Sequence, residues 1–210
     1  MKLSIFILAL VLIAVSYIPY FTGIFRGRIV PHPAQWLSWM IIISVYSLVL
    51  MHNDGGWATW VNITLATINA AVLVLGLKFA RKVTFTTSDW VCLVTSIIAL
   101  GFWLLVNQPA LAVLLLTIAS FIGFIPALRK AYQSPYDESA FTWSVNGFRY
   151  ILTGIIVASY TFTTIFNSAF WTVLYVGAAV FLLVRRKQLK ENQDSTDRKA
   201  NRADKTRATS

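Results

Sequence analysis

The chain is dominated by long apolar runs that are separated by short polar segments. Seven runs can be drawn, and each has roughly the 18 to 21 residues that a helix needs to cross about 30 Å of hydrocarbon. In chain order the runs are Leu3–Phe21, Ala34–Met51, Trp57–Leu77, Ser88–Val106, Pro109–Leu128, Phe141–Tyr160 and Phe166–Val184. This pattern predicts an all-α membrane protein with seven transmembrane helices in residues 1–184. The polar, charge-mixed residues 185–210 predict a basic, disordered tail.

Composition supports the same class and excludes several others. The chain is 57% hydrophobic and only 12% charged, which is too apolar for a soluble domain. Its single cysteine rules out a disulfide framework, and no apolar run holds the clustered His, Asp, Glu or Cys that a membrane metalloenzyme or protease needs. A glycine-rich phosphate loop is also absent from the sequence. We therefore expect no enzyme activity, no catalytic residues, no metal, no cofactor and no nucleic-acid partner.

Two prolines and two tryptophans indicate an internal repeat. Pro19 and Pro126 are 107 positions apart, and so are Trp36 and Trp143. Each proline closes an apolar run, basic residues follow it, and each tryptophan opens the next run. This layout predicts two three-helix repeats, residues 3–77 and 109–184. A linker helix over residues 88–106 would return the chain across the membrane, so the expected arrangement is 3+1+3 with parallel repeats.

Charge predicts how the bundle lies in the membrane. With seven crossings, nearly all Lys and Arg residues fall on one side, among them Arg26, Arg28, Lys78, Arg81, Lys82, Arg129, Lys130, Arg185, Arg186 and Lys187. The other side carries only Lys2 and Asp54. By the positive-inside rule the amino terminus lies outside and the tail is cytoplasmic. The expected location is the bacterial inner membrane.

The proline-ended first and fifth helices, the 3+1+3 layout and the outside amino terminus resemble the PQ-loop/SWEET superfamily of small-solute transporters. The likeness covers residues 3–184. It departs at the motif, because Tyr20 and Ala127 follow the prolines where the family has glutamine. The layout is also similar to that of nicotinamide-riboside-type permeases. The resemblance implies a solute site near the midplane between the repeats, hinges at Pro19 and Pro126, and asparagines on helices three and seven that line the pocket.

Arg149 is the main candidate for chemistry within the apolar runs. It shares one helical face with Thr142, Asn146 and Thr153, and it lies near mid-depth in its run. A central arginine costs roughly 2.5–3.5 kcal/mol to insert, so it needs a cavity or a partner. Two interpretations stay open: Arg149 binds a carboxylate or phosphate of the substrate, or it ties helices together through carbonyls left free upstream of Pro126 or through Asn side chains.

Other polar residues at membrane depth complete the predicted site. Asn62 and Asn69 share a stripe on the third run, and Tyr175 lies at mid-depth on the seventh. Hydrogen bonding between helices is the structural alternative for each asparagine. We interpret Trp36 and Trp143 as anchors at the membrane interface. The predicted substrate-binding set is Arg149, Asn146, Asn69, Asn62 and Tyr175.

The sequence thus predicts an alternating-access transporter for a small polar solute, with an anionic solute as one option. Its expected partners are the lipid bilayer and a small-molecule solute, and a homo-oligomer is left open. The alternative from another class is a non-transporting seven-helix membrane sensor or scaffold.

Overall fold

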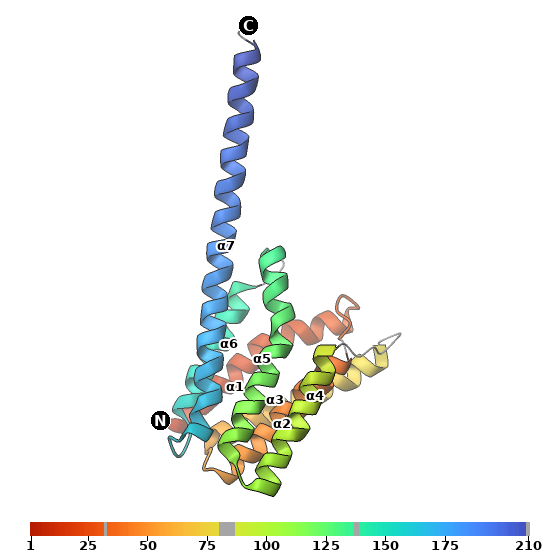
Figure 1. Ribbon diagram of the computed structural model, residues 1–210, viewed down its shortest axis with the longest axis vertical. Helices are drawn as coiled ribbons and strands as arrows, with labels where there is room; N and C mark the ends of the chain where they lie inside the picture. The colour runs from red at the N-terminus through yellow and green to blue at the C-terminus, as the bar shows by residue number, and fades with distance from the viewer. Residues whose placement is uncertain (32, 80–86, 137–138, 209–210) are drawn as a thin grey trace.

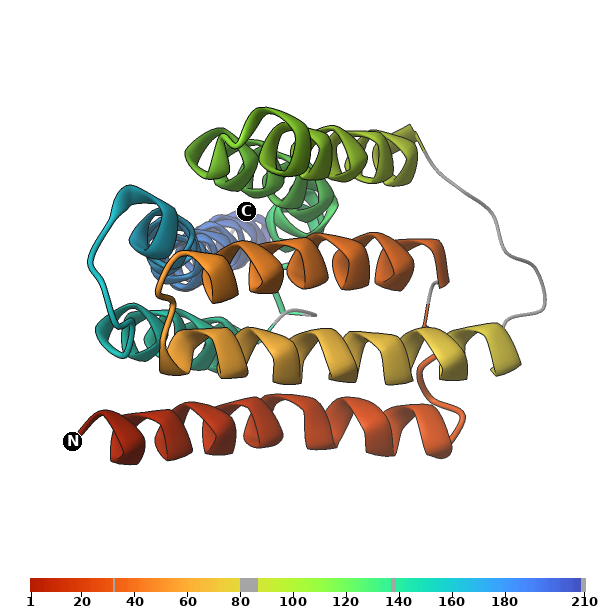
Figure 2. The same ribbon diagram turned by 90° about the horizontal axis from the view of Figure 1, so that it is seen from below.

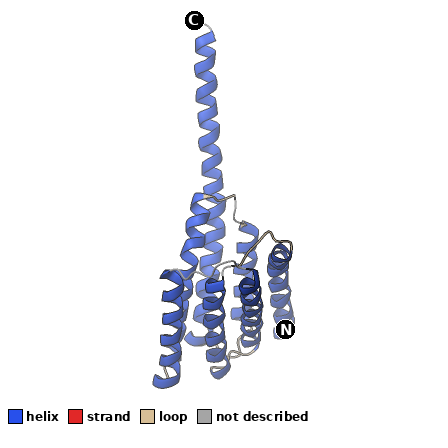
Figure 3. Ribbon diagram, turned by 90° about the vertical axis from the view of Figure 1, so that its right-hand side faces the viewer, coloured by secondary structure: helices blue, strands red, loops and turns tan. Residues whose placement is uncertain are grey.

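The computed structural model describes residues 1–31, 33–79, 87–136 and 139–208, and these residues form helices joined by short loops, with no strand among them (Figures 1 and 3). The helices are α1 (Lys2–Phe25), α2 (Pro33–His52), α3 (Trp57–Phe79), α4 (Thr87–Val106), α5 (Pro109–Gln133), α6 (Ala140–Ile155) and α7 (Phe162–Ala208). Five of them, α1, α2, α3, α5 and the first part of α7, are long and apolar enough to cross a membrane. The predicted all-α class is confirmed, and so is the presence of several helices whose length and composition are compatible with a membrane. Arg81 and Lys82, which we placed on the basic side, lie outside the described residues.

Two helices extend beyond their predicted ends. α1 continues to Phe25 and α5 to Gln133, so Pro19 and Pro126 lie inside helices and do not end them. A proline removes one backbone donor, and a membrane helix tolerates this when nearby groups bond the freed carbonyls. In α1 the carbonyl that lacks its backbone donor because of Pro19 is that of Val15, and in the next turn the hydroxyl of Thr22 donates to the carbonyls of Ile18 and Pro19, at 2.6 and 3.0 Å.

The sixth helix is shorter than predicted and the seventh begins earlier. α6 ends at Ile155, where we expected the run to reach Tyr160. α7 begins directly after Thr161, because Thr161 and Thr164 cap its first turn reciprocally. The Thr161 amide donates to Thr164 Oγ1 at 3.0 Å, and the Thr164 amide donates to Thr161 Oγ1 at 3.4 Å. Two threonines three positions apart therefore start the helix, in the manner of a capping box.

The polar carboxyl-terminal segment is helical, whereas we expected a disordered tail. α7 runs on through residues 185–208 and projects well beyond the other helices (Figure 1). Residues 185–208 contain neither glycine nor proline, and half of them are Lys, Arg or Ala. These residues have high helix propensity, so nothing in this stretch interrupts a helix that has already begun in the bundle.

The helices pack in a definite order. α3 lies between α1 and α2, and α7 lies between α5 and α6. Figure 2 shows α1, α3 and α2 as successive layers, with α4 and α5 beyond α2. Across the bundle α1 contacts α6, α2 contacts α5, and α4 packs on α5 and α2. Three clusters of buried apolar residues fill these contacts: one on α2, α4 and α5, one on α1, α3 and α6 with residues just after α6, and one on α5, α6 and α7.

Two loops and the start of α1 meet at one end of the bundle. The carbonyl of Asp54, between α2 and α3, accepts hydrogen bonds from the amides of Ala158 and Ser159, between α6 and α7, at 3.2 and 3.1 Å. Lys2 Nζ donates to the Val157 carbonyl at 2.6 Å. We call this set the loop contact. It joins the hairpin of α2 and α3 to the hairpin of α6 and α7.

Gly56 is required at the loop contact for two separate reasons. Its φ is +57°, and a Cβ there would lie 2.8 Å from the backbone nitrogen of Ala158. Gly27 has a similar φ of +68° but open space around it. We expect Gly27→Ala to lower the free energy of unfolding by about 1 kcal/mol through φ alone, and Gly56→Ala by about 2 kcal/mol or more. Thermal midpoints in detergent measure both, and equal shifts would show that the loops do not need this close approach.

Candidate functional site

Arg149 is buried in the middle of the bundle. Ser139 caps α6 by accepting from the amide of Thr142 at 3.1 Å, which fixes where the helix begins. Arg149 and Thr153 lie on the face of α6 that is turned into the bundle, and only 4% of the surface of Arg149 is exposed. The hydroxyl of Thr153 donates back to the carbonyl of Arg149 at 2.9 Å, so the pair stays on one helical face. Arg149 is therefore turned into the bundle, where a buried cation needs a cavity or a partner.

The guanidinium of Arg149 is held by an aromatic ring and has donors to spare. Its Cζ lies 4.0 Å from the centroid of the Tyr150 ring. Its Nε and Nη1 atoms are buried and have no hydrogen-bond partner. The positive charge also lies within electrostatic range of the hydroxyls of Tyr17 on α1 and Tyr175 on α7. Buried donors without an acceptor cost about 1–3 kcal/mol each, and more when charged, so an anion at this point would gain unusually strong hydrogen bonds.

Asn69 is the second buried side chain with unused polar atoms. It is 1% exposed, and neither its Nδ2 nor its Oδ1 has a hydrogen-bond partner. An amide in this state can both donate to and accept from a ligand. The residue lies on α3, which contacts α6.

The geometry of α3 and α6 places Arg149 and Asn69 at similar depths in the bundle. The loop contact places the start of α3 beside the end of α6, so the two helices are antiparallel. Measured from that end, Arg149 lies about 9 Å down α6 and Asn69 about 18 Å down α3. Side chains lean toward the amino terminus of their own helix, so these two lean toward a common depth.

Aromatic rings form one wall of this region. Tyr150 stacks with Trp171 and Tyr175, with centroids 6.0 and 5.8 Å apart and planes within 20° of parallel. Phe124 lies edge-on to Trp171 and to Tyr175, at 5.5 and 5.3 Å. The rings come from α5, α6 and α7 and pack against one another. They therefore hold Tyr150 in the position from which it supports Arg149.

The structure brings together only part of the predicted set. Arg149 and Asn69 lie at similar depths and Tyr175 lies near the Arg149 charge, whereas the amides of Asn62 and Asn146 bond carbonyls of their own helices. The Nδ2 of Asn62 donates to the Ala58 carbonyl and the Nδ2 of Asn146 to the Thr142 carbonyl, both at 2.9 Å. Such local bonds satisfy the amide without a neighbouring helix or a ligand, which makes these two weaker candidates.

The two tryptophans related by the proposed repeat lie in different surroundings. We interpreted Trp143 as an interface anchor, but it is 6% exposed and packs 5.8 Å from Phe124, so the interpretation is wrong for this residue. Trp36, its repeat-mate, is half-buried beside Tyr20. The hinge role of Pro19 and Pro126 stays a prediction.

Sequence reasoning missed Tyr17, Tyr150 and Trp171. Tyr150 follows Arg149 directly and Trp171 lies one helical turn before Tyr175, so adjacency to the predicted residues was the available signal. Within the described residues no group of His, Cys, Asp and Glu could hold a metal ion.

No protein family, curated protein or solved structure matches the chain.

Proposed function

We propose that this protein is a membrane transporter for a small anionic solute, whose carboxylate or phosphate binds Arg149. The observation that carries the proposal is the buried guanidinium whose Nε and Nη1 have no hydrogen-bond partner. Asn69 would bond a second polar group of the solute, and the Tyr150 ring would support the guanidinium from behind. A solute in this position would supply the acceptors that the fold leaves out.

Helix packing supports a two-repeat mechanism. In the proposed repeat, α1, α2 and α3 correspond to α5, α6 and α7. The middle helix is the third of each group, because α3 lies between α1 and α2 and α7 lies between α5 and α6. The same correspondence converts the contact of α1 with α6 into that of α5 with α2, which is also present. With α4 as the linker, this order supports the 3+1+3 arrangement that the resemblance to the PQ-loop/SWEET superfamily implies. Arg149 and Asn69 come from different repeats, so rocking of one repeat against the other would open and close the site.

The loop contact supports a gate at one end of this pathway. It ties the two repeats together through backbone hydrogen bonds at the end that carries Lys2 and Asp54. By the one-sided charge pattern this end would face outward and the Arg185 end would face the cytoplasm. Opening toward the outside would break the bonds of Asp54 to Ala158 and Ser159. Pro19 and Pro126 are the proposed hinges.

Uptake into proteoliposomes tests the transport function. Purified protein is reconstituted and supplied with labelled small carboxylates and phosphates, each paired with its uncharged amide or alcohol analogue. We expect at least one acid to enter faster than into protein-free liposomes, and faster than its neutral analogue. If no acid in a broad panel is taken up above the protein-free rate, the transport proposal fails.

The rival proposal is a non-transporting sensor or scaffold, and one observation favours it. α7 continues as a helix through residues 185–208, beyond the bundle, and the sequence of this segment is polar and basic. In that case the acids would bind, as seen in a raised thermal midpoint, without any uptake. The same purified protein serves both measurements.

A further inference from the structure

A continuous seam runs between α5 and α7 along one side of the bundle. At one point Phe121 of α5 meets Phe170 of α7 edge-on, with centroids 5.8 Å apart. Nearer the basic end Tyr132 of α5 stacks on Phe181 of α7, with centroids 6.4 Å apart and planes 19° from parallel. The two contacts are 11 residues apart on each helix, which is about 16 Å at 1.5 Å per residue.

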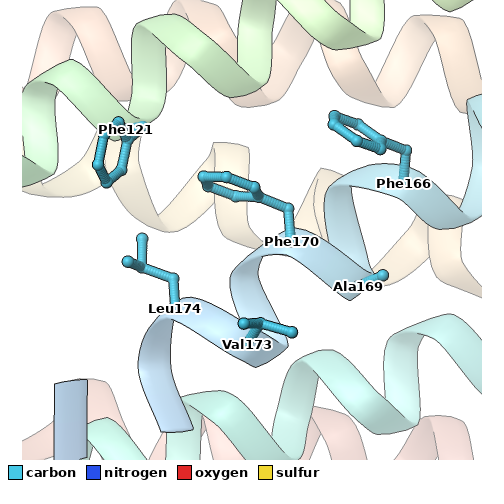
Figure 4. Close-up of a pocket in the computed structure, with 6 residues that line it drawn as sticks. All are labelled: Phe121, Phe166, Ala169, Phe170, Val173 and Leu174. Atoms are coloured by element: carbon cyan, nitrogen blue, oxygen red, sulfur yellow. The ribbon is translucent and has the colours of Figure 1, made fainter. Parts of the chain in front are cut away.

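An apolar groove of about 390 Å³ opens beside the first of these contacts (Figure 4). Figure 4 shows the groove lined by Phe121 from α5 and by a run of residues from α7: Phe166, Ala169, Phe170, Val173 and Leu174. Val173 is 73% exposed, so this side of the helix faces the surrounding medium. In a membrane-spanning helix that medium is lipid hydrocarbon.

An unobstructed track leads along α7 from the groove to the basic end. Gly177 is exposed, and a Cβ placed on it would find nothing within 4 Å. Val180 and Val184, further along the helix, are each about half exposed. The surface between groove and basic end is therefore apolar and open.

The track ends at an arginine with an unused donor. Arg185 Cζ lies 4.4 Å from the centroid of the Tyr132 ring, and its Nε is buried without a hydrogen-bond partner. The next residue is fixed in place, because Arg186 Nε donates to the Pro135 carbonyl at 3.0 Å and Tyr136 donates to the Arg186 carbonyl at 3.2 Å. A guanidinium stacked on a ring presents its edge, which suits a phosphate.

We propose that this seam is a binding site for one anionic phospholipid, with its phosphate at Arg185 and one acyl chain running past Gly177 into the groove. The lengths agree: Leu174 lies 11 residues before Arg185, about 16 Å along the helix, and one leaflet of hydrocarbon is about 15 Å deep. The charge pattern agrees too, because the cation stands at the end of the apolar track, where a headgroup would lie. The site is independent of the transport function.

Two variants with matched controls test the site on the full-length protein. Arg185→Gln removes the headgroup charge, with Arg28→Gln as the control at an exposed cation on the same side. Gly177→Leu fills the track, with Gly101→Leu on α4 as the control, because a Cβ at Gly101 also meets nothing within 4 Å. Native mass spectrometry and thermal midpoints are measured while delipidated protein is titrated with phosphatidylglycerol, with phosphatidylcholine of the same chains, and with glycerol phosphate.

We expect phosphatidylglycerol to bind one per chain and to raise the midpoint, and the other two ligands to bind at least ten-fold more weakly. Arg185→Gln and Gly177→Leu should each weaken phosphatidylglycerol binding by ten-fold or more, while both controls bind like the parent chain. Unchanged lipid-free midpoints establish that the variants are folded. Equal binding of phosphatidylcholine, tight binding of glycerol phosphate, or equal losses in the test and control variants would each overturn the proposal.

Discussion

Replacing Arg149 with methionine is expected to weaken binding of the transported acid by about 30-fold or more, while leaving the folded protein as stable as before or more so. Methionine keeps much of the side-chain volume and removes the charge. Loss of a buried charge partner costs roughly 2–5 kcal/mol of binding free energy, which sets the expected decrease. Stability should not fall, because Arg149 is only 4% exposed and two of its donors have no partner, so an expensive buried cation is removed.

Affinity and thermal midpoint are measured on the same preparation, with the acid that gives the largest uptake. Arg149→Lys is the second variant: it keeps the charge but loses the planar fork and the stacking on Tyr150, so it should recover only part of the affinity. A lower midpoint with unchanged affinity in the methionine variant would show instead that Arg149 ties helices together.

Replacing Trp171 with alanine is expected to give the largest loss of stability of any single substitution in the aromatic wall, about 3 kcal/mol or more. Trp171 is 2% exposed and lies within 6.0 Å, centroid to centroid, of the rings of Trp39, Phe124, Tyr150, Phe170 and Tyr175. The bilayer gives little hydrophobic drive for helix association, so this loss comes from packing across α5, α6 and α7. Denaturation of the detergent-solubilised protein measures it.

Trp60→Ala is the matched control, because Trp60 lies on α3 and is 56% exposed. Its loss should change the free energy of unfolding by less than about 1 kcal/mol. Acid binding should also fall in Trp171→Ala, since Tyr150 loses its stacking partner and no longer holds Arg149. If Trp171→Ala loses as little stability as Trp60→Ala, the rings are not packed as described.

The helices could be predicted well and their ends less well. A membrane helix needs about 20 apolar residues, and this requirement dominates the sequence so strongly that all seven runs coincide with helices. Ends depend on weaker local effects. Pro19 sits within α1, a threonine pair starts α7 earlier than hydropathy suggests, and residues after 185 stay helical because nothing interrupts them.

The candidate site could be predicted in part, for a physical reason. Arg149 and Asn69 stood out because polar side chains at membrane depth are rare and must face inward. Asn62 fits the same pattern, but its amide donates to a carbonyl of its own helix. The spacing of polar residues along the sequence does not predict such a local hydrogen bond. The aromatic wall was missed because rings are common throughout apolar runs. Which rings meet depends on the contacts between α5, α6 and α7, and these exist only in the folded chain.

The unbroken course of α7 has a mechanical consequence. Beyond Arg186, which still contacts the residues that follow α5, the helix continues for about 33 Å to Ala208. A tilt of α7 by about 10° would sweep its far end sideways by about 6 Å, since displacement grows with the length of the arm. Small rotations among packed helices would thus become displacements large enough for a spin label or a docked protein to register. The far end of α7 would therefore move further than the packed helices at its base.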